Sequence, residues 1–353
     1  MPGERVLVTG GTGFIAARCI VQLLEAGYRV RTTVRDASRE PAVRALAAAA
    51  DVTGAAAGAD RLEIVEAHLL SNSGWPEAVA DCRYVLHVAS PFPLTSPTNE
   101  NDLVVPARQG ALRVLRASRD AGVERVVLTS SFAAVGYGRA DPGRPYTEDD
   151  WSDLSATSTG EVTPYMKSKT LAERAAWAFM SKEGGALELA VVNPVAVFGP
   201  LLGPKLSSSV ALVLSLLRGD VPAVPHMFTS AVDVRDVADL HLRAMTHPDA
   251  RGERFLAVTG SPLSYLQLAH LLRSRLGETA SRVPKRQLPD WMVSLMAPFT
   301  PQLEEIRPLL GLSKPASNAK AKRMLGWAPR PNIEAILASA ESLVELGLVP
   351  RRP

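Results

Sequence analysis

The feature that most constrains the fold is a glycine-rich turn near the N-terminus, in the run Val6-Leu7-Val8-Thr9-Gly10-Gly11-Thr12-Gly13-Phe14-Ile15-Ala16. A β-branched run leads directly into this turn, and a helical pattern follows it. Gly10 permits a tight turn, and Gly13 allows the backbone to approach phosphate oxygens. Ala16, at the third position of the spacing, is small enough for a helix to pack closely on a strand. No lysine follows in the spacing of a nucleoside-triphosphate loop, so the turn predicts a dinucleotide site.

Short apolar runs alternate with longer helical patterns through the first two hundred residues. Strands are expected at 5–9, 29–34, 62–65, 84–88, 125–129 and 187–192, and helices at 13–26, 102–121 and 164–182. This alternation predicts an α/β fold with a Rossmann-like, doubly wound parallel sheet. Residues 45–60 are rich in alanine and glycine and predict a helix end followed by a flexible loop. Beyond residue 194 the pattern is irregular, with helices expected at 235–246, 264–277, 302–310 and 333–346, and it predicts a smaller, mostly helical lobe.

The composition excludes several classes of partner. Thirty-nine basic and 36 acidic residues give a net charge of +3, too balanced for binding nucleic acid or an anionic membrane surface. The longest apolar stretch of the second half, 210–217, is far shorter than the ~20 residues of a spanning helix. The chain opens without a leader pattern, so we expect a cytoplasmic protein. The two cysteines predict buried thiols, and the six histidines follow no metal-ligand spacing, so no metal site is expected.

The end of the second expected strand carries information on the nucleotide. An acidic side chain at this tip binds the ribose hydroxyls of NAD, whereas an arginine suits the additional 2′-phosphate of NADP. Arg35 occupies the tip, and Arg39 follows it by about one helical turn. Asp36 lies beside Arg35, so the pattern is mixed, but it favours NADP(H) over NAD(H).

A second group of residues indicates proton-transfer chemistry. Tyr165 and Lys169 are four residues apart in an expected helix and therefore share one face. Thr129 ends the fifth expected strand and leads into Ser130 and Ser131, at the edge where doubly wound sheets bind ligands. A tyrosine with a reference pKa near 10 must be acidified to exchange protons near neutrality, and a nearby lysine and an oxidised nicotinamide both favour the phenolate.

Together these motifs resemble the extended short-chain dehydrogenase/reductase superfamily, in its dihydroflavonol-reductase-like branch. Within that branch the chain is most similar to NADPH-dependent aldehyde and ketone reductases of the methylglyoxal/isovaleraldehyde type. The resemblance implies a dinucleotide-binding domain formed by residues 1–193 plus about 232–258, and a substrate lobe formed by about 194–231 plus 259–353. The segments that carry it are Val6–Ile15, Leu86–Phe92, Val126–Ser131, Tyr165–Trp177, Asn193–Pro200 and Asp233–Ala238.

The resemblance also implies roles for individual residues. Ser131 polarises a carbonyl group, Tyr165 donates the proton, and Lys169 lowers the tyrosine pKa and holds the nicotinamide ribose. Relatives occur as monomers and as homodimers, so either state is expected, with a small carbonyl compound as substrate. The residues implied to bind the cofactor NADP(H) are Gly10, Gly13, Phe14, Ile15, Arg35, Arg39, His68, Leu69, Val88, Ala89, Thr129, Tyr165, Lys169, Pro194 and Val195, and those implied to line the substrate pocket are Phe92, Phe132, Gly136, Ala196 and Met227.

Three positions depart from the family pattern. His68 stands where many relatives carry an aspartate near the adenine, and Arg113 replaces a frequent asparagine of the fourth helix. Gly136 replaces an asparagine of the dihydroflavonol reductases, which argues against flavonoid recognition. Gly136 and Ala196 are also smaller than their counterparts in some relatives, and they predict a roomier pocket.

Alternative functions remain at this level. A nucleotide-sugar epimerase or dehydratase of the same superfamily keeps NAD bound, but Arg35 and the run Phe132-Ala133-Ala134-Val135 beside the serine argue against it. A non-catalytic NADP-binding module would not need the Tyr165 and Lys169 pair. The residues around Tyr165 do not match the signature of cinnamoyl-CoA reductases. An NADPH-dependent carbonyl reductase is therefore the leading prediction.

Overall fold

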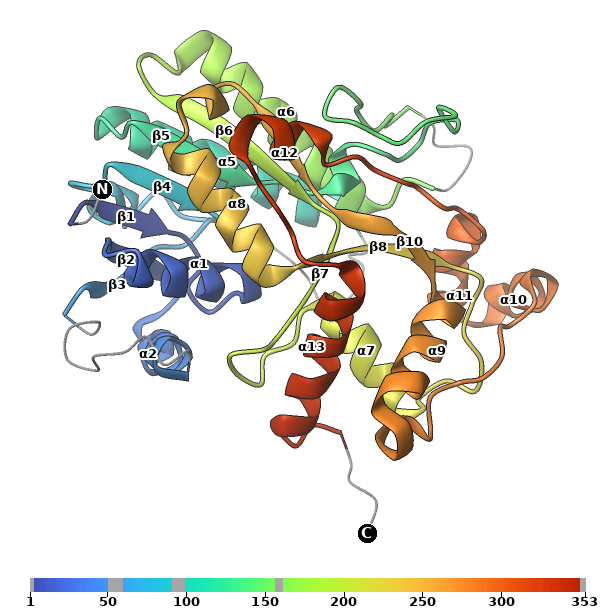
Figure 1. Ribbon diagram of the computed structural model, residues 1–353. Coiled ribbons are helices and arrows are strands. Elements are labelled where there is room, and N and C mark those ends of the chain that lie inside the picture. Colours follow the sequence, from blue (N-terminus) through green and yellow to red (C-terminus); the bar gives the residue numbers. More distant parts are fainter. Residues whose placement is uncertain (1–2, 50–59, 91–98, 156–160, 350–353) are drawn as a thin grey trace.

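The computed structural model describes residues 3–49, 60–90, 99–155 and 161–349. Its largest element is a sheet of seven strands in the order β3-β2-β1-β4-β5-β6-β9, in which every neighbouring pair is parallel (Figure 1). Strand β1 lies between β2 and β4, which is the point where the winding direction reverses. The strands are β1 (Arg5–Val8), β2 (Arg29–Val34), β3 (Leu62–Glu66), β4 (Tyr84–His87), β5 (Arg125–Thr129), β6 (Glu188–Pro194) and β9 (Arg254–Ala257).

Helices cover both faces of this sheet. One apolar core joins the sheet to α1 (Phe14–Glu25), α8 (Val234–Thr246) and α12 (Ala319–Leu325). A second joins the opposite face to α4 (Trp75–Val79), α5 (Asn101–Asp120) and α6 (Pro164–Glu183). Alternate strand residues enter different cores, so that Leu7 belongs to the second core while Val6 and Val8 belong to the first. The predicted Rossmann-like fold is therefore confirmed.

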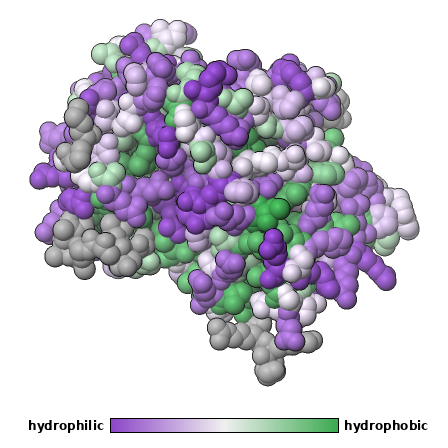
Figure 2. Space-filling view, viewed as in Figure 1, coloured by the Kyte–Doolittle hydropathy of each residue, from purple (hydrophilic) through white to green (hydrophobic). Residues whose placement is uncertain are grey.

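A smaller sheet lies beside the first one. It has the order β10-β8-β7, in which β10 (Thr259–Ser264) is antiparallel to β8 (Phe228–Asp233), and β7 (Ala196–Phe198) is parallel to β8. Around it lie α7 (Ser208–Arg218), α9 (Tyr265–Leu276), α10 (Asp290–Met296), α11 (Pro301–Ile306) and α13 (Asn332–Glu345). Residues of α7, α9 and α13 form a separate apolar core there. On the face seen in Figure 2, hydrophobic residues gather between α13 and α9, whereas hydrophilic residues dominate over α8.

Several sequence expectations need correction. The small sheet was not predicted, because its strands are short and β10 contains Gly260 and Pro262. The helix expected at 302–310 ends at Ile306 and continues as a 3₁₀ turn, Arg307–Leu309, since Pro308 cannot donate a helical hydrogen bond. A complete helix, α2 (Glu40–Ala49), precedes the expected loop, and residues 50–59 lie outside the described part.

Two further expectations concern the cysteines and membrane-spanning helices. Cys19 and Cys82 are buried, as predicted, and burial raises the pKa of the Cys82 thiol to about 11. Among the helices within the described ranges, none has both the length and the apolar character that a membrane span requires.

Candidate active site

The glycine-rich turn joins β1 to α1 at the carboxyl edge of the sheet. Gly10 has a φ of +76°, and a Cβ atom there would lie 3.0 Å from the Ala89 Cβ, so only glycine fits without strain. Gly13 is the N-cap residue of α1 and provides no side-chain cap. The first N–H groups of this helix have no intrahelical acceptor and carry its positive dipole end. Phe14 and Ile15 begin the helix. The turn and the helix start therefore fit a pyrophosphate.

The tip of β2 places two arginines near this turn. Arg35 is exposed immediately after the strand. The Arg39 Nε donates a hydrogen bond to Asp36 Oδ2 at 3.0 Å, so the Asp36 carboxylate is directed toward Arg39. Arg35 forms no ion pair with any residue in the described ranges, and its side chain is exposed to solvent. Of the two arginines, Arg35 is thus the one available to an anionic group.

The catalytic candidates come together where β5 ends and α6 begins. Ser131 caps a short 3₁₀ turn, Phe132–Ala134, and its Oγ accepts a hydrogen bond from the Ala133 N–H at 3.1 Å. Thr163 caps α6 and Pro164 occupies its first turn, which sets where the helix starts and places Tyr165 in that first turn. The side chains of Ser131 and Tyr165 are hydrogen-bonded to one another. A substrate oxygen placed between them would accept a hydrogen bond from both hydroxyls.

Lys169 lies one turn further along α6, and its Nζ is 6.0 Å from the centre of the Tyr165 ring. Burial lowers the pKa of Lys169 to about 8, against the opposing effect of the Glu173 carboxylate. Burial also raises the pKa of Tyr165, and the hydrogen bond with Ser131 only partly opposes this. The lowering of the tyrosine pKa that is implied for Lys169 and an oxidised nicotinamide stays a prediction, and these side chains alone do not produce it. They hold Tyr165 as the neutral phenol, which is the form that donates a proton.

A buried carboxylate beneath the lysine was not singled out from the sequence. Glu173 is fully buried and accepts hydrogen bonds from Ser130 Oγ at 2.6 Å and Asn193 Nδ2 at 2.8 Å. It also forms a buried ion pair with Arg254 at 2.5 Å. The signal was present, since Glu173 continues the four-residue spacing of Tyr165 and Lys169, but its partners come from distant strands. This network fixes the β5 end against α6.

Two histidines are buried near the same strand ends. His87 Nδ1 is hydrogen-bonded to Thr9 Oγ1 at 2.9 Å, and burial together with the positive charge of Lys169 lowers the pKa of His87 to about 3. The Thr129 hydroxyl is hydrogen-bonded to His241 Nε2 at 2.7 Å and therefore turns toward α8. Both rings are neutral at ordinary pH. Within the described ranges, no group of His, Cys, Asp and Glu side chains is arranged to hold a metal ion.

The other predicted cofactor residues lie along the same edge. The Ala89 N–H donates to Thr9 Oγ1 at 2.9 Å, next to Val88. Pro194 is the last residue of β6, and Val195 follows it. His68 and Leu69 follow β3, and the His68 ring accepts a hydrogen bond from the Leu70 N–H. Arg113, the departure on α5, donates to the Leu69 carbonyl at 2.7 Å and to Asn72 Oδ1. This arginine therefore fastens the loop after β3 to α5.

The predicted substrate side is aromatic. The Phe132 ring packs edge-on against Tyr137 and Tyr146, with centroid distances of 5.9 and 5.7 Å. A Cβ atom at Gly136 would lie 2.5 Å from Phe132 Cζ. The space beside Gly136 is therefore filled by the Phe132 ring and does not enlarge a pocket, contrary to the sequence expectation.

The remaining pocket predictions lie in the second lobe or outside the described part. Ala196 opens β7, and the Met227 carbonyl accepts a hydrogen bond from the Tyr265 N–H at 2.9 Å. Phe92 falls within 91–98, outside the described residues. An unpredicted pair, Glu161 and Lys314, forms an ion pair at 2.6 Å, with the Lys314 Nζ above the Tyr137 ring. This pair joins the aromatic wall to the segment that follows α11.

Known proteins resemble this chain over most of its length. Residues 6–257 match the model of the NAD dependent epimerase/dehydratase family. Cinnamoyl-CoA reductase CAD2 of Medicago truncatula is 34% identical over 294 residues, covering 82% of this chain and 83% of that protein. The putative NADPH-dependent methylglyoxal reductase GRP2 of Candida albicans is 33% identical over 295 residues, covering 79% and 85%. These nearly equal identities do not separate the two substrate types.

A solved structure agrees with these relatives. Gre2 from Candida albicans, in complex with NADPH, superposes with a TM-score of 0.79 at 25% identity, covering 97% of this chain and 99% of that one. The predicted resemblance to extended short-chain reductases is thereby confirmed. The chain belongs to the NAD dependent epimerase/dehydratase family.

Proposed function

We propose that this protein is an NADPH-dependent carbonyl reductase that converts a ketone or an aldehyde to an alcohol. The enzyme is an oxidoreductase and its cofactor is NADP(H), in keeping with the reductases that it resembles and with the NADPH complex of Gre2. The observation that carries the proposal is the hydrogen-bonded pair of Ser131 and Tyr165, with Lys169 one helical turn away.

The residues present fit the dinucleotide. The turn around Gly10 is so close to Ala89 that a side chain would fill the cradle, and the uncapped start of α1 offers N–H groups to the pyrophosphate. Arg35 would meet the 2′-phosphate, and Lys169 would meet the nicotinamide ribose. When bound, the reduced cofactor supplies a hydride to the carbonyl carbon and leaves as NADP⁺.

Ser131 and Tyr165 bind and protonate the carbonyl oxygen of the substrate. Ser131 donates a hydrogen bond to the carbonyl oxygen, and Tyr165 gives its phenolic proton to that oxygen as the C=O electron pair moves onto it. The raised pKa of Tyr165 keeps the proton on the phenol until the oxygen becomes more basic. General-acid assistance of this kind contributes ~10²–10⁴-fold to the rate. Lys169, charged below its pKa of about 8, stabilises the phenolate that remains.

Cofactor consumption at 340 nm tests the proposal. Purified protein is supplied with NADPH or NADH and with methylglyoxal, isovaleraldehyde, a β-ketoester or an aryl ketone in turn. We expect turnover with NADPH that exceeds turnover with NADH, and the ranking of the substrates reports the shape of the pocket. Absence of turnover with both cofactors, together with NAD that copurifies with the protein, would contradict the proposal and favour a nucleotide-sugar epimerase or dehydratase.

A further inference from the structure

One loop of the second lobe returns to the dinucleotide turn. We call residues 199–206, between β7 and α7, the strap. Its start is fixed by two hydrogen bonds from backbone N–H groups to α13, from Gly199 to Ser339 Oγ at 2.7 Å and from Leu201 to Ser342 Oγ at 3.1 Å. Arg18 of α1 donates to the Pro200 carbonyl at 3.2 Å. The strap is therefore anchored to both lobes.

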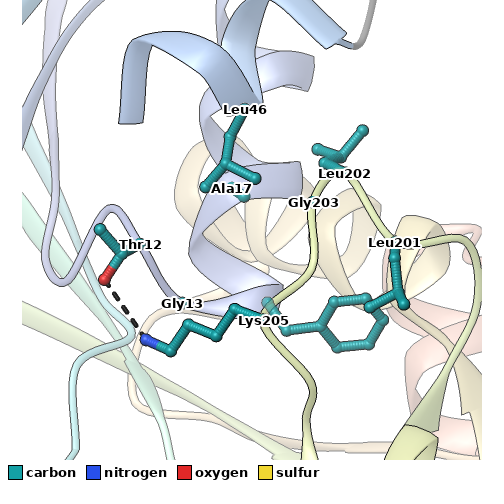
Figure 3. Close-up of a pocket in the computed structure, with 9 residues that line it drawn as sticks. Thr12, Gly13, Ala17, Leu46, Leu201, Leu202, Gly203 and Lys205 are labelled. Carbon is teal, nitrogen blue, oxygen red and sulfur yellow. Dashed lines mark hydrogen bonds between the residues drawn. The ribbon is translucent and has the colours of Figure 1, made fainter. Parts of the chain in front are cut away.

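The middle of the strap passes close to α2. A Cβ atom at Gly203 would lie 3.0 Å from Leu46 Cδ2, so the backbone approaches this helix closely. Between the strap and the start of α1 is a small hollow lined by Thr12, Gly13 and Leu46, among others (Figure 3). The strap thus covers the outer side of the turn that is built to hold the cofactor phosphates.

The strap carries a lysine to this turn. The Lys205 side chain runs toward Thr12, and its Nζ donates a hydrogen bond to Thr12 Oγ1 at 3.4 Å (Figure 3). Partial burial and the neighbouring positive charges of Arg39 and Arg35 lower the pKa of Lys205. Three cations thus come together at the tip of β2.

The charges in this cluster are not balanced. Arg39 pairs with Asp36, but neither Lys205 nor Arg35 pairs with a carboxylate in the part of the chain that the structure describes. Cations that repel one another beside a phosphate-binding turn are stabilised by a bound anion. The location of these cations indicates which phosphate they would bind. The pyrophosphate faces the N–H groups at Gly10 and Gly13. The arginines instead lie at the tip of β2, where the 2′-position of the adenosine ribose is expected.

We propose that Lys205 binds the 2′-phosphate of NADP(H) from the strap, opposite Arg35, so that the second lobe contributes directly to the choice between NADPH and NADH. The inference rests on NADP(H) as the cofactor and is independent of the substrate. A purely structural role for Lys205, through its long hydrogen bond to Thr12, would leave the affinity for the 2′-phosphate unchanged.

Titration calorimetry with two nucleotides separates the phosphate positions. Adenosine 2′,5′-diphosphate carries the 2′-phosphate, whereas adenosine 5′-diphosphate carries only the pyrophosphate. We expect Lys205→Met to weaken binding of the 2′,5′-diphosphate about 10- to 100-fold and to leave binding of the 5′-diphosphate unchanged. Lys205→Arg should retain most of the affinity. The matched control, Lys182→Met in the last turn of α6, should bind both nucleotides as the parent protein does.

Two results of this titration would overturn the inference. Equal weakening of both nucleotides would place Lys205 at the pyrophosphate and overturn the inference, as would no weakening of either. A parent protein that does not prefer the 2′,5′-diphosphate would overturn the assignment of NADP(H) as the cofactor. Because these nucleotides lack nicotinamide, the test does not depend on carbonyl reduction. As a second measurement, the double variant with Arg35→Met should lose less affinity for the 2′,5′-diphosphate than the sum of the single losses, because both side chains hold one phosphate.

Discussion

Glu173 lies one turn of α6 beyond Lys169, and its carboxylate raises the lysine pKa against the effect of burial. Removing that charge should let the pKa of Lys169 fall further below about 8. We therefore expect Glu173→Gln to move the alkaline limb of the kcat profile to lower pH, because Lys169 then loses its proton earlier. A pH series of steady-state kinetics measures the shift.

Arg254→Met serves as the matched control for that series. It breaks the same buried ion pair but keeps the Glu173 carboxylate, so both variants should lose stability, by about 3–5 kcal/mol for a broken buried pair, while only Glu173→Gln moves the alkaline limb downward. An equal downward movement in both variants would show that the effect is structural.

Tyr165→Phe removes the proposed proton donor and leaves the ring in place. We expect kcat to fall ~10²–10⁴-fold, while binding of NADPH, followed by its fluorescence, remains as in the parent protein. Activity within a factor of two of the parent would exclude Tyr165 as the general acid.

Arg35→Glu places a carboxylate at the tip of β2. Because the charge reverses beside the 2′-position, the ratio of kcat/KM for NADPH to that for NADH should fall at least about tenfold. The ratio is measured with one carbonyl substrate at saturation. Arg29→Glu at the opposite end of the same strand is the control, and a comparable fall in that variant would mean that net charge alone is responsible.

Gly136→Ala introduces a methyl group where the Phe132 ring now lies. Overpacking of this kind costs about 1–3 kcal/mol, so Tm should decrease and the KM values of aryl ketones should change as the ring is displaced. Adding Phe132→Leu, which shortens the opposing side chain, should restore most of the lost Tm. If the double variant is less stable than Gly136→Ala alone, the two residues do not compete for the same space.

His87 and His241 should make the fold sensitive to acid. Burial lowers their pKa values to about 3 and about 4, from 6.5 in an unfolded chain. Their stabilisation is complete above pH 6.5 and is lost as the pH falls toward these values, because the unfolded chain then binds protons that the folded chain does not. Each contributes a slope of at most ~1.4 kcal/mol per pH unit. Denaturant unfolding between pH 7 and pH 4 should show this loss, and His87→Gln should reduce its slope.

The first half of the fold was predictable because its signals are local. Each central strand is a continuous apolar run, and Tyr165 and Lys169 share a helix face through their spacing alone. The small sheet was not predictable in this way, since β10 pairs with β8 across a register irregularity and contains Gly260 and Pro262. Its strands are defined by tertiary pairing rather than by their own composition.

The candidate site also contains residues that could be predicted from the sequence and residues that could not. Ser131 and Tyr165 follow from motifs, but three partners of Glu173 come from the end of β5, from β6 and from β9, and no spacing relates these three to Glu173. Burial raises the pKa of Tyr165 in the protein alone, and the acidification expected from Lys169 and an oxidised nicotinamide stays a prediction. Lys205 lies forty residues beyond Tyr165 in a loop whose position depends on α13, so its approach to Thr12 could not be inferred from sequence.

The two serines of α13 that hold the strap have a consequence for synthesis. Synthesis proceeds from the N-terminus, so the strap is made well before Ser339 and Ser342, which lie 140 and 141 residues after their partners Gly199 and Leu201. A nascent chain that stops before residue 342 cannot form both hydrogen bonds. The arrangement that brings Lys205 to Thr12 therefore depends on α13, and this corner of the molecule can be completed only after that helix has been made.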